Sequence, residues 1–394
     1  MPRLRIAVVS PFIDKKHGTE RQIAECLSRL ASEYEFHLYS SRVEDVEPGR
    51  IVWHRVPALP GPHLFGYLWW FAANHIQRWR DRRFRGLRPD LVYSPGINCL
   101  DADVISVHVI FARLRERLRG ELDLAGNPMC AWPRIVHRRL YYRLIQAIEQ
   151  RVYRRPRVSL AAVSHKVAYD LERYFGRAQG VTVIYNGIDL DQFSPQRRAA
   201  LREASRAALG LATSDFALLL VGNDWKGKGL PCLLEAVRQA DDPRLRVLVA
   251  GSDNPAAFAP AIAKAGLAAR LRFLPIRPDV EVYYAAADAY VGPSLEDTFA
   301  MPVAESMACG LPVIASRGAG VAELITTGCD GLVLEDPGDS ATLAGMIGQL
   351  VADPEFCLRL GEAAAQTARQ CNWERNAQQM RELFERAWRF KQVR

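Results

Sequence analysis

Short apolar runs alternate with longer amphipathic segments along almost the whole sequence. This alternation predicts β-α-β units, in which buried parallel strands are covered on both faces by helices. We expect strands at residues 5–10, 36–40, 90–95, 102–109 and 159–165 in the first half, and at 216–222, 245–251, 271–275, 289–294 and 312–316 in the second. The predicted fold class is therefore α/β, with doubly wound parallel sheets.

The strands fall into two consecutive sets, which predicts two domains. A chain of 394 residues is also long for one hydrophobic core. The polar, turn-forming stretch 186–200 separates the two sets, so we place the first domain at residues 1–190 and the second at 191–373. Ligands of doubly wound sheets bind beyond the carboxyl ends of the strands. The loop after the first strand lacks G-x-G-x-x-G, which argues against a dehydrogenase.

Composition restricts the setting in which the protein works. Hydrophobic residues make up 49% of the chain and charged residues 24%, as in ordinary globular proteins. No apolar run approaches the ~20 residues that a membrane span needs, and the first run fits a buried strand better than a signal peptide. The eight cysteines are scattered without a C-x-x-C pair, so neither a zinc site nor a disulfide framework is predicted. We expect a cytoplasmic protein.

Positive charge is concentrated in the first half of the chain. Residues 1–190 hold 30 basic and 19 acidic residues, whereas the remainder holds 22 and 25. Residues 63–86 combine aromatic side chains with arginines in a segment too short and too charged to cross a membrane. Such a segment fits an anionic headgroup layer; the alternative is a core helix with an ordinary solvated arginine face. Nucleic acid is not an expected partner, because no recognition motif accompanies the charge.

Two carboxylates, Asp297 and Glu305, follow one of the expected strands. Pro302 suits the first turn of a helix and Gly310, followed by Pro312, suits its end, so Asp297 falls in a loop and Glu305 inside the helix. Two carboxylates a loop apart can accept hydrogen bonds from a polyhydroxylated ligand at two points. Alternatively, Glu305 satisfies the start of the helix and Asp297 is solvated. Spacing alone does not separate these interpretations.

The segment 293–316 resembles the nucleotide-sugar site of retaining glycosyltransferases of family four, which have the GT-B fold. The family pattern has two glutamates separated by seven residues. Glu305 matches the second, and Asp297, or Glu296 if the loop shifts by one residue, matches the first. Ala300 stands where the family usually has glycine. The resemblance implies that the second acid holds the donor's ribose hydroxyls and the first contacts the transferred sugar, and it implies donor-binding roles for Asp297, Thr298, Phe299, Ala300 and Glu305.

A second matching segment, residues 221–236, resembles the family's diphosphate-binding loop. Lys228 stands where the family has a lysine that contacts the diphosphate, and a helix start beside it would add backbone N–H groups. The resemblance implies donor-binding roles for Gly222, Asn223 and Lys228, although Asn223 replaces the family's arginine. The alternative for Lys228 is a solvated loop lysine.

The first half matches the family in two further places. Gly18 belongs to a glycine-rich loop after the first strand, in which His17 replaces a second glycine, and His108 stands at a strand end that lies near the reacting sugar in relatives. The alternative for His108 is a hydrogen-bonded core residue. Residues 374–394 resemble the family's final helix, which returns to the first domain. The implied catalytic residues are His108, Asp297 and Lys228.

The resemblance implies two domains facing a cleft, and transfer of a sugar from a nucleoside diphosphate sugar with retention at the anomeric carbon. It implies no metal and no other cofactor. We expect UDP-glucose or a close relative as donor, and a glycan or lipid-linked acceptor in bacterial cell-envelope polysaccharide synthesis, as in lipopolysaccharide-core α-glucosyltransferases. The enzyme would then be cytoplasmic or peripheral on the inner face of the membrane. The alternatives are a non-catalytic partner subunit and a nucleotide-sugar epimerase of the same fold.

Overall fold

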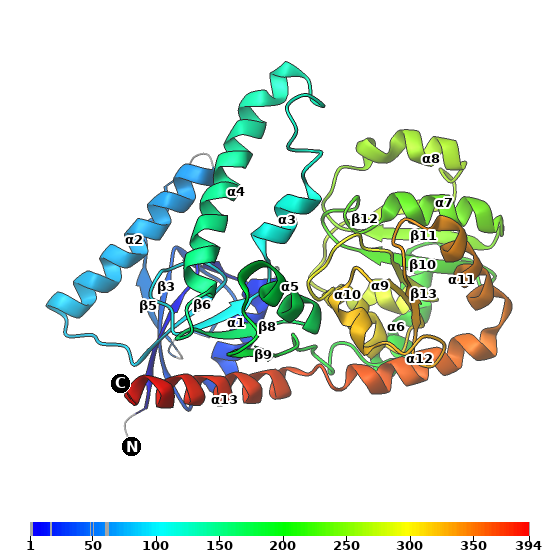
Figure 1. The fold of residues 1–394 in the computed structure, drawn as a ribbon. Coiled ribbons are helices and arrows are strands. Elements are labelled where there is room, and N and C mark those ends of the chain that lie inside the picture. The colour runs from blue at the N-terminus through cyan, green and yellow to red at the C-terminus, as the bar shows by residue number, and fades with distance from the viewer. Residues whose placement is uncertain (1–2, 16–17, 48, 50, 60–62, 394) are drawn as a thin grey trace. The chain divides into compact units, whose positions relative to one another are not determined.

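The chain forms two compact units (Figure 1). The computed structural model describes residues 3–15, 18–47, 49, 51–59 and 63–393, so His17 lies outside the described residues. The first unit comprises Met1–Tyr185 and Trp373–Arg394, and the second comprises Asn186–Asn372. The sequence placed these junctions at residues 190 and 373. Each unit is described by itself below.

The first unit is built on a parallel sheet of seven strands in the order β5-β3-β1-β6-β7-β8-β9. Its strands are β1 (Arg5–Val9), β3 (Glu35–Ser40), β5 (Val52–Arg55), β6 (Leu91–Pro95), β7 (Val104–Val107), β8 (Ser159–Ala162) and β9 (Val181–Val183). A two-stranded parallel ladder pairs β2 (Phe12–Ile13) with β4 (Arg42–Val43). The helices are α1 (Gly18–Leu30), α2 (His63–Phe84), α3 (Phe111–Arg117), α4 (Trp132–Tyr153), α5 (His165–Phe175) and α13 (Trp373–Gln392), with a 3-10 turn at Met129–Ala131.

The second unit is built on a parallel sheet of six strands in the order β12-β11-β10-β13-β14-β15. Its strands are β10 (Phe216–Val221), β11 (Leu245–Ala250), β12 (Leu271–Leu274), β13 (Ala289–Gly292), β14 (Val313–Ser316) and β15 (Leu332–Leu334). The helices are α6 (Pro195–Ala208), α7 (Leu230–Ala240), α8 (Ala259–Ala265), α9 (Glu281–Ala286), α10 (Met301–Ala308), α11 (Ser340–Ala352) and α12 (Pro354–Ala368), with 3-10 turns at Pro255–Phe258 and Gly320–Leu324.

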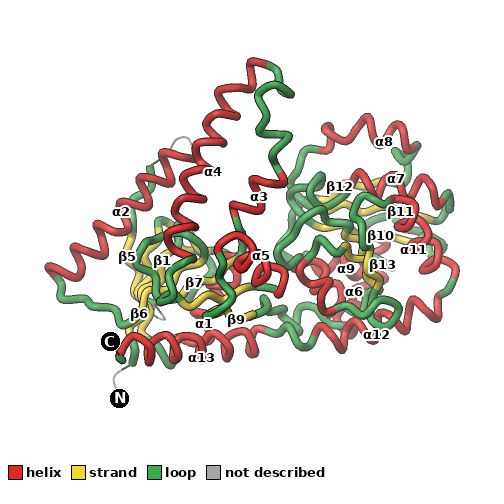
Figure 2. The backbone as a smooth tube through the Cα atoms, viewed as in Figure 1, coloured by secondary structure: helices red, strands yellow, loops and turns green. Residues whose placement is uncertain are grey.

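Helices cover both faces of each sheet, so the strands form the interior (Figure 2). Leu218 and Leu220 of β10 and Val247 and Val249 of β11 are completely buried in the core of the second unit. Burying such a side chain contributes about 1.5–3 kcal/mol, so these strands hold the sheet together. In the first unit the terminal helix α13 packs against α1 and against β6, β7 and β8, and thereby closes the core at the end of the chain.

The expected α/β architecture of two doubly wound parallel sheets is confirmed, and each of the ten expected strands is present. The order of strands reverses direction once in each sheet. In the second sheet β10 has β11 on one side and β13 on the other, so the loops that follow β10 and β13 diverge from adjacent strand ends. A crevice at such a switch point is where α/β proteins bind their ligands.

Candidate active site

The predicted residues of the second unit gather at this switch point. Gly222 to Gly229 follow β10 directly, and Pro293 to Ala300 follow β13. The backbone N–H of Leu295 donates to the carbonyl oxygen of Gly227 at 2.8 Å, which joins the two loops. The sheet therefore brings together Gly222, Asn223, Lys228, Asp297, Thr298, Phe299, Ala300 and Glu305, which lie far apart in the sequence.

Lys228 and Asp297 form an ion pair across the two loops. The Lys228 ammonium donates to Oδ2 of Asp297, and both side chains are largely buried. Oδ1 of Asp297 accepts the backbone N–H groups of Phe299 at 3.2 Å and Ala300 at 2.9 Å. Burial alone would raise the pKa of Asp297, but Lys228 and the two N–H groups outweigh it and hold the pKa below its usual value. Asp297 is therefore an ionised carboxylate, and Lys228 is neither solvated nor randomly oriented.

Two glycines allow the loops to approach so closely. The aliphatic chain of Lys228 lies over Gly222: a Cβ there would come within 2.8 Å of Cε and 2.9 Å of Cγ. Gly229 has φ +84°, and a Cβ there would come within 2.0 Å of the Pro293 carbonyl oxygen. Any larger residue at either position would displace the lysine or separate the loops. The position of the Lys228 side chain therefore requires a glycine at residue 222.

Glu305 lies in α10, the helix that follows the loop carrying Asp297. Its side chain is buried, and Oε2 accepts a 2.7 Å hydrogen bond from the Tyr284 hydroxyl of α9. Burial, followed by the Glu305 charge, raises the Tyr284 pKa, so this hydroxyl stays a donor at ordinary pH. The pKa of Tyr290 on β13 is also raised, first by burial and then by the carboxylates of Asp297 and Glu305.

Asp297 is ion-paired and not solvated, and its Oδ1 accepts the backbone N–H groups of Phe299 and Ala300 just before α10 begins. The N-cap position of α10 is Ala300, which makes no side-chain cap. Ala300 has φ +70° and ψ +65°, a left-handed conformation that costs an alanine roughly 1 kcal/mol and suits the glycine usual in the family. As expected, Pro302 lies in the first turn of α10 and Gly310 is left-handed just beyond its end.

Two predicted donor-binding residues are occupied by contacts within the protein. The Phe299 side chain is buried, and its carbonyl oxygen accepts the N–H of Val321, so its side chain belongs to the core. Oδ1 of Asn223 accepts the N–H of Ser252 at 3.2 Å, which ties the loop after β10 to the loop after β11. Thr298 lies between Asp297 and Phe299 and is partly exposed. Tyr284 was not predicted from the sequence, because α9 has only six residues and is too short to show a helical pattern of apolar residues.

Two predicted residues belong to the first unit. Gly18 is the first residue of α1, and His108 directly follows β7 in the interior of the sheet. His108 is buried, its Nε2 has no hydrogen-bond partner, and burial lowers its pKa to about 4. The ring is therefore neutral at ordinary pH. An unpartnered polar atom in this position is costly in the protein alone, so it does not behave as the hydrogen-bonded core histidine of the alternative interpretation.

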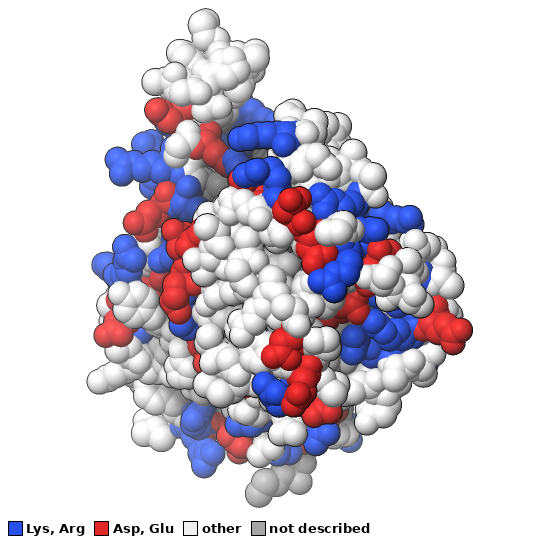
Figure 3. Space-filling model, turned by 90° about the vertical axis from the view of Figure 1, so that its right-hand side faces the viewer, with Lys and Arg blue, Asp and Glu red and all other residues white. Residues whose placement is uncertain are grey.

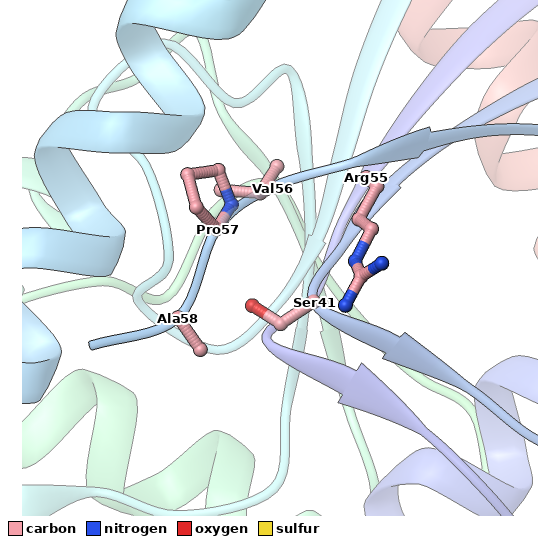
Figure 4. A pocket seen from close by; sticks show the side chains of 5 residues that line it. All are labelled: Ser41, Arg55, Val56, Pro57 and Ala58. Atoms are coloured by element: carbon pink, nitrogen blue, oxygen red, sulfur yellow. The ribbon is translucent and has the colours of Figure 1, made fainter. Parts of the chain in front are cut away.

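Further features of the residues that the structure describes concern metal binding, membrane spans and pockets. Within them, no group of three or more His, Cys, Asp or Glu side chains is arranged to hold a metal ion. No helix in the described ranges has the length and apolarity needed to cross a membrane. A shallow pocket of the first unit is lined by Ser41, Arg55, Val56, Pro57 and Ala58 (Figure 4) and contains none of the predicted residues.

The chain resembles solved structures over nearly its whole length. WaaG, a glycosyltransferase involved in lipopolysaccharide biosynthesis, has a TM-score of 0.78 at 19% identity, covering 95% of this chain and 98% of that one. Sucrose-phosphate synthase from Thermosynechococcus elongatus has 0.77 at 20%, covering 98% and 99%. Anabaena HepE in complex with UDP-glucose has 0.71 at 20%, covering 97% and 100%. At these identities the likeness establishes the fold.

Sequence comparison identifies curated relatives and two family models. D-inositol 3-phosphate glycosyltransferase of Corynebacterium urealyticum is 30% identical over 60% of this chain and 58% of its own. That of Streptomyces bingchenggensis is 32% identical over 58% and 53%. The chain thus spans little more than half the length of these relatives. The model of Glycosyltransferase Family 4 matches residues 16–192, and that of Glycosyl transferases group 1 matches residues 202–367. Together the two models span both units, and the chain belongs to the family-four glycosyltransferases of the GT-B fold.

Proposed function

We propose that the protein transfers a sugar from a nucleoside diphosphate sugar to an acceptor, with retention at the anomeric carbon and without a metal. The observation that supports this most strongly is the ion pair of Lys228 and Asp297 at the switch point, with Glu305 in the helix that follows. A cation beside a helix start suits a diphosphate, and carboxylates suit sugar hydroxyls. One such crevice would hold both parts of a nucleotide sugar.

The described contacts suggest a role for each side chain. Lys228, one residue before Gly229 and the start of α7, would neutralise charge that grows on the leaving diphosphate. Asp297 would hold this lysine in place, since its two oxygens bind Lys228 and the loop backbone. Glu305, fixed by Tyr284, would accept hydroxyls of the donor. His108 is neutral, so it would act as a hydrogen-bond partner of the sugar and not as a cationic acid.

The similar proteins indicate which substrates to test first. The likeness to a protein solved with UDP-glucose supports UDP-glucose as the first donor to test. The likeness to WaaG supports a glycan or lipid-linked acceptor of the lipopolysaccharide-core kind. The curated relatives act on D-inositol 3-phosphate by name, which makes a phosphorylated cyclitol a second acceptor class. A cytoplasmic enzyme, free or peripheral on the membrane, would have access to all of these.

The test measures release of nucleoside diphosphate from UDP-, GDP- and ADP-sugars in the presence of EDTA, for wild type and Glu305→Ala. We expect slow hydrolysis of one donor by wild type and its loss in the variant. Glu362→Ala, which removes an exposed carboxylate of α12, is the matched control and should hydrolyse the donor as wild type does.

Two other outcomes would favour the alternative functions, a non-catalytic partner subunit or an epimerase. If no donor is hydrolysed and none raises the melting temperature, catalysis is excluded and the non-catalytic partner subunit takes its place. If the donor sugar is isomerised without an acceptor, the protein is an epimerase. A requirement for added divalent metal would contradict metal independence alone.

A further inference from the structure

Helix α2 has an apolar face that is directed away from the sheet of the first unit. Phe65, Leu68, Trp69, Ile76 and Trp79 are each between 43% and 59% exposed, and we call them the apolar stripe. Phe65, Trp69, Ile76 and Trp79 of the stripe, with Ala72 between them, recur at intervals of four and three, so they follow one side of the helix over about 21 Å. The opposite side buries Trp70, Asn74 and Asp81. Exposed large apolar residues in such a row mark an interaction surface.

Basic residues outnumber acids on the two helices that carry and flank this stripe. Helix α2 contains four arginines and one acid, Asp81, and α4, which packs against α2, contains five arginines and one acid, Glu149. Both acids are buried. Asp81 contacts His54 at 3.0 Å and Arg85 at 3.2 Å, and Glu149 accepts the backbone N–H of Phe111 at 2.8 Å. The outward sides of the two helices therefore carry guanidinium groups and no carboxylate of their own. From outside the two helices, Asp101 pairs with Arg78, whose side chain is largely buried, and Asp123 lies 3.7 Å from Arg139.

Glu149 contributes little negative charge even from the interior. Burial raises its pKa to about 8, against the opposing effect of the N–H groups of Phe111 and Ala112. Residues 63–157, which include both helices, contain 18 arginines and eight acids, an excess larger than the net charge of +8 of the whole chain. Elsewhere the surface is mixed: the face in Figure 3 has basic and acidic side chains side by side.

We propose that the outward side of α2, together with α4, docks onto an anionic lipid bilayer. The helix would lie in the plane of the surface, with the apolar stripe at the boundary of headgroups and acyl chains and the arginines among the anionic headgroups. It would not enter the hydrocarbon core end-on, because its four arginines would be costly there. A bilayer satisfies both the stripe and the charge. A second copy of the chain would present the same arginines, and a nucleic acid would leave the stripe unpartnered.

The experiment measures binding to vesicles by flotation. Vesicles of phosphatidylcholine alone are compared with vesicles of three parts phosphatidylcholine to one part phosphatidylglycerol, at low and high salt. We expect binding to the anionic vesicles only, weakened by salt. Ile76→Ser with Trp79→Ser should reduce the affinity at least tenfold, and so should Arg80→Glu with Arg83→Glu. Leu358→Ser and Lys264→Glu, exposed positions on α12 and α8, are the matched controls and should bind as wild type.

Each result decides the proposal. The stripe variants should remain folded, because Ile76 and Trp79 are more than half exposed, and circular dichroism checks this. Equal binding to both kinds of vesicle, no binding, or unchanged binding by the stripe variants would overturn the proposal. So would a wild-type dimer that the stripe variants convert to monomer in light scattering. The assay contains no nucleotide sugar, so its outcome is independent of the proposed transferase activity.

Discussion

The strand ends of the two units differ in how their polar groups are satisfied. In the second unit Lys228 and Asp297 neutralise each other and Glu305 is held by Tyr284, so the site is assembled in the protein alone. In the first unit His108 is buried with an unpartnered Nε2. A preassembled site needs no reorganisation when charge develops on a ligand, whereas an unpartnered group gains its hydrogen bond only when a ligand supplies it. The difference suggests that the second unit is rigid toward its ligand and that the first depends on one.

Lys228→Ala removes the centre of the preassembled site and should have the largest effect. It deletes the cation proposed for the diphosphate and leaves the buried Asp297 carboxylate without its partner. We expect donor hydrolysis to fall by about 10²–10³-fold, the usual cost of losing one transition-state charge donor. Lys264→Ala, on the exposed side of α8, is the control. An unchanged rate in Lys228→Ala would remove this residue from the mechanism.

His108→Asn tests the unpartnered group through the pH dependence of stability. The folded pKa of about 4 lies below the ~6.5 of an unfolded histidine. As pH falls from 6.5 to 4 the unfolded chain takes up a proton that the folded chain does not, so wild type should lose up to about 3 kcal/mol. The variant should lose less, as measured by thermal melting at each pH. The exposed His63→Asn should follow wild type, and parallel curves for His108→Asn and wild type would disprove this.

Tyr284→Phe tests whether donor binding by Glu305 depends on the hydrogen bond from the Tyr284 hydroxyl. Losing a hydrogen bond to a charged group costs about 1.5–3 kcal/mol, so we expect the KM for the donor to rise at least tenfold with a smaller change in kcat. The effect should vanish in a Glu305→Ala background. Tyr283→Phe deletes a neighbouring hydroxyl, which donates to the Pro275 carbonyl oxygen at 2.9 Å, and serves as the control. Equal effects of the two substitutions would indicate general loosening of α9.

Ala300→Gly should have the smallest effect, and a favourable one. It relieves the left-handed conformation at φ +70° and should stabilise the second unit by up to about 1 kcal/mol, less the entropy that glycine loses. The expected result is a small rise in melting temperature with hydrolysis retained. A lower melting temperature would show that the Ala300 methyl group contributes more by packing than its backbone costs.

The sequence predicted the interior strands of both sheets and one edge strand, β12, but missed the other three edge strands. Strands buried on both faces, such as β10 and β11, are continuous apolar runs and are recognised easily. The missed strands β5 and β9 lie at the two edges of the first sheet, where they are short and partly exposed, and β15 has three residues at an edge of the second. The missed strands have only three or four residues each, which is too short for an apolar or alternating pattern to be recognised.

In the site, the predicted residue types are present, but their contacts could not be read from spacing. The ion pair of Lys228 with Asp297 spans 69 positions and depends on the approach of Gly229 to Pro293. Asp297 also binds two backbone N–H groups, because the backbone is left-handed at Ala300. An alanine in the sequence does not predict this conformation. The contribution of Tyr284 depends on packing between α9 and α10, for which no motif exists.

The buried acids of α2 and α4 link the inside of the first unit to its outer surface. Asp81 and Glu149 are the sole acidic residues of α2 and α4, and both bind partners in the interior of the first unit. The positive charge of the outer surface is thus a consequence of how the helices are attached, because the attachment uses their acids. Substitutions that add acids on the exposed sides of α2 and α4 would lower the surface charge without disturbing the interior. Moving either existing acid to the exposed side would remove the contacts that attach its helix.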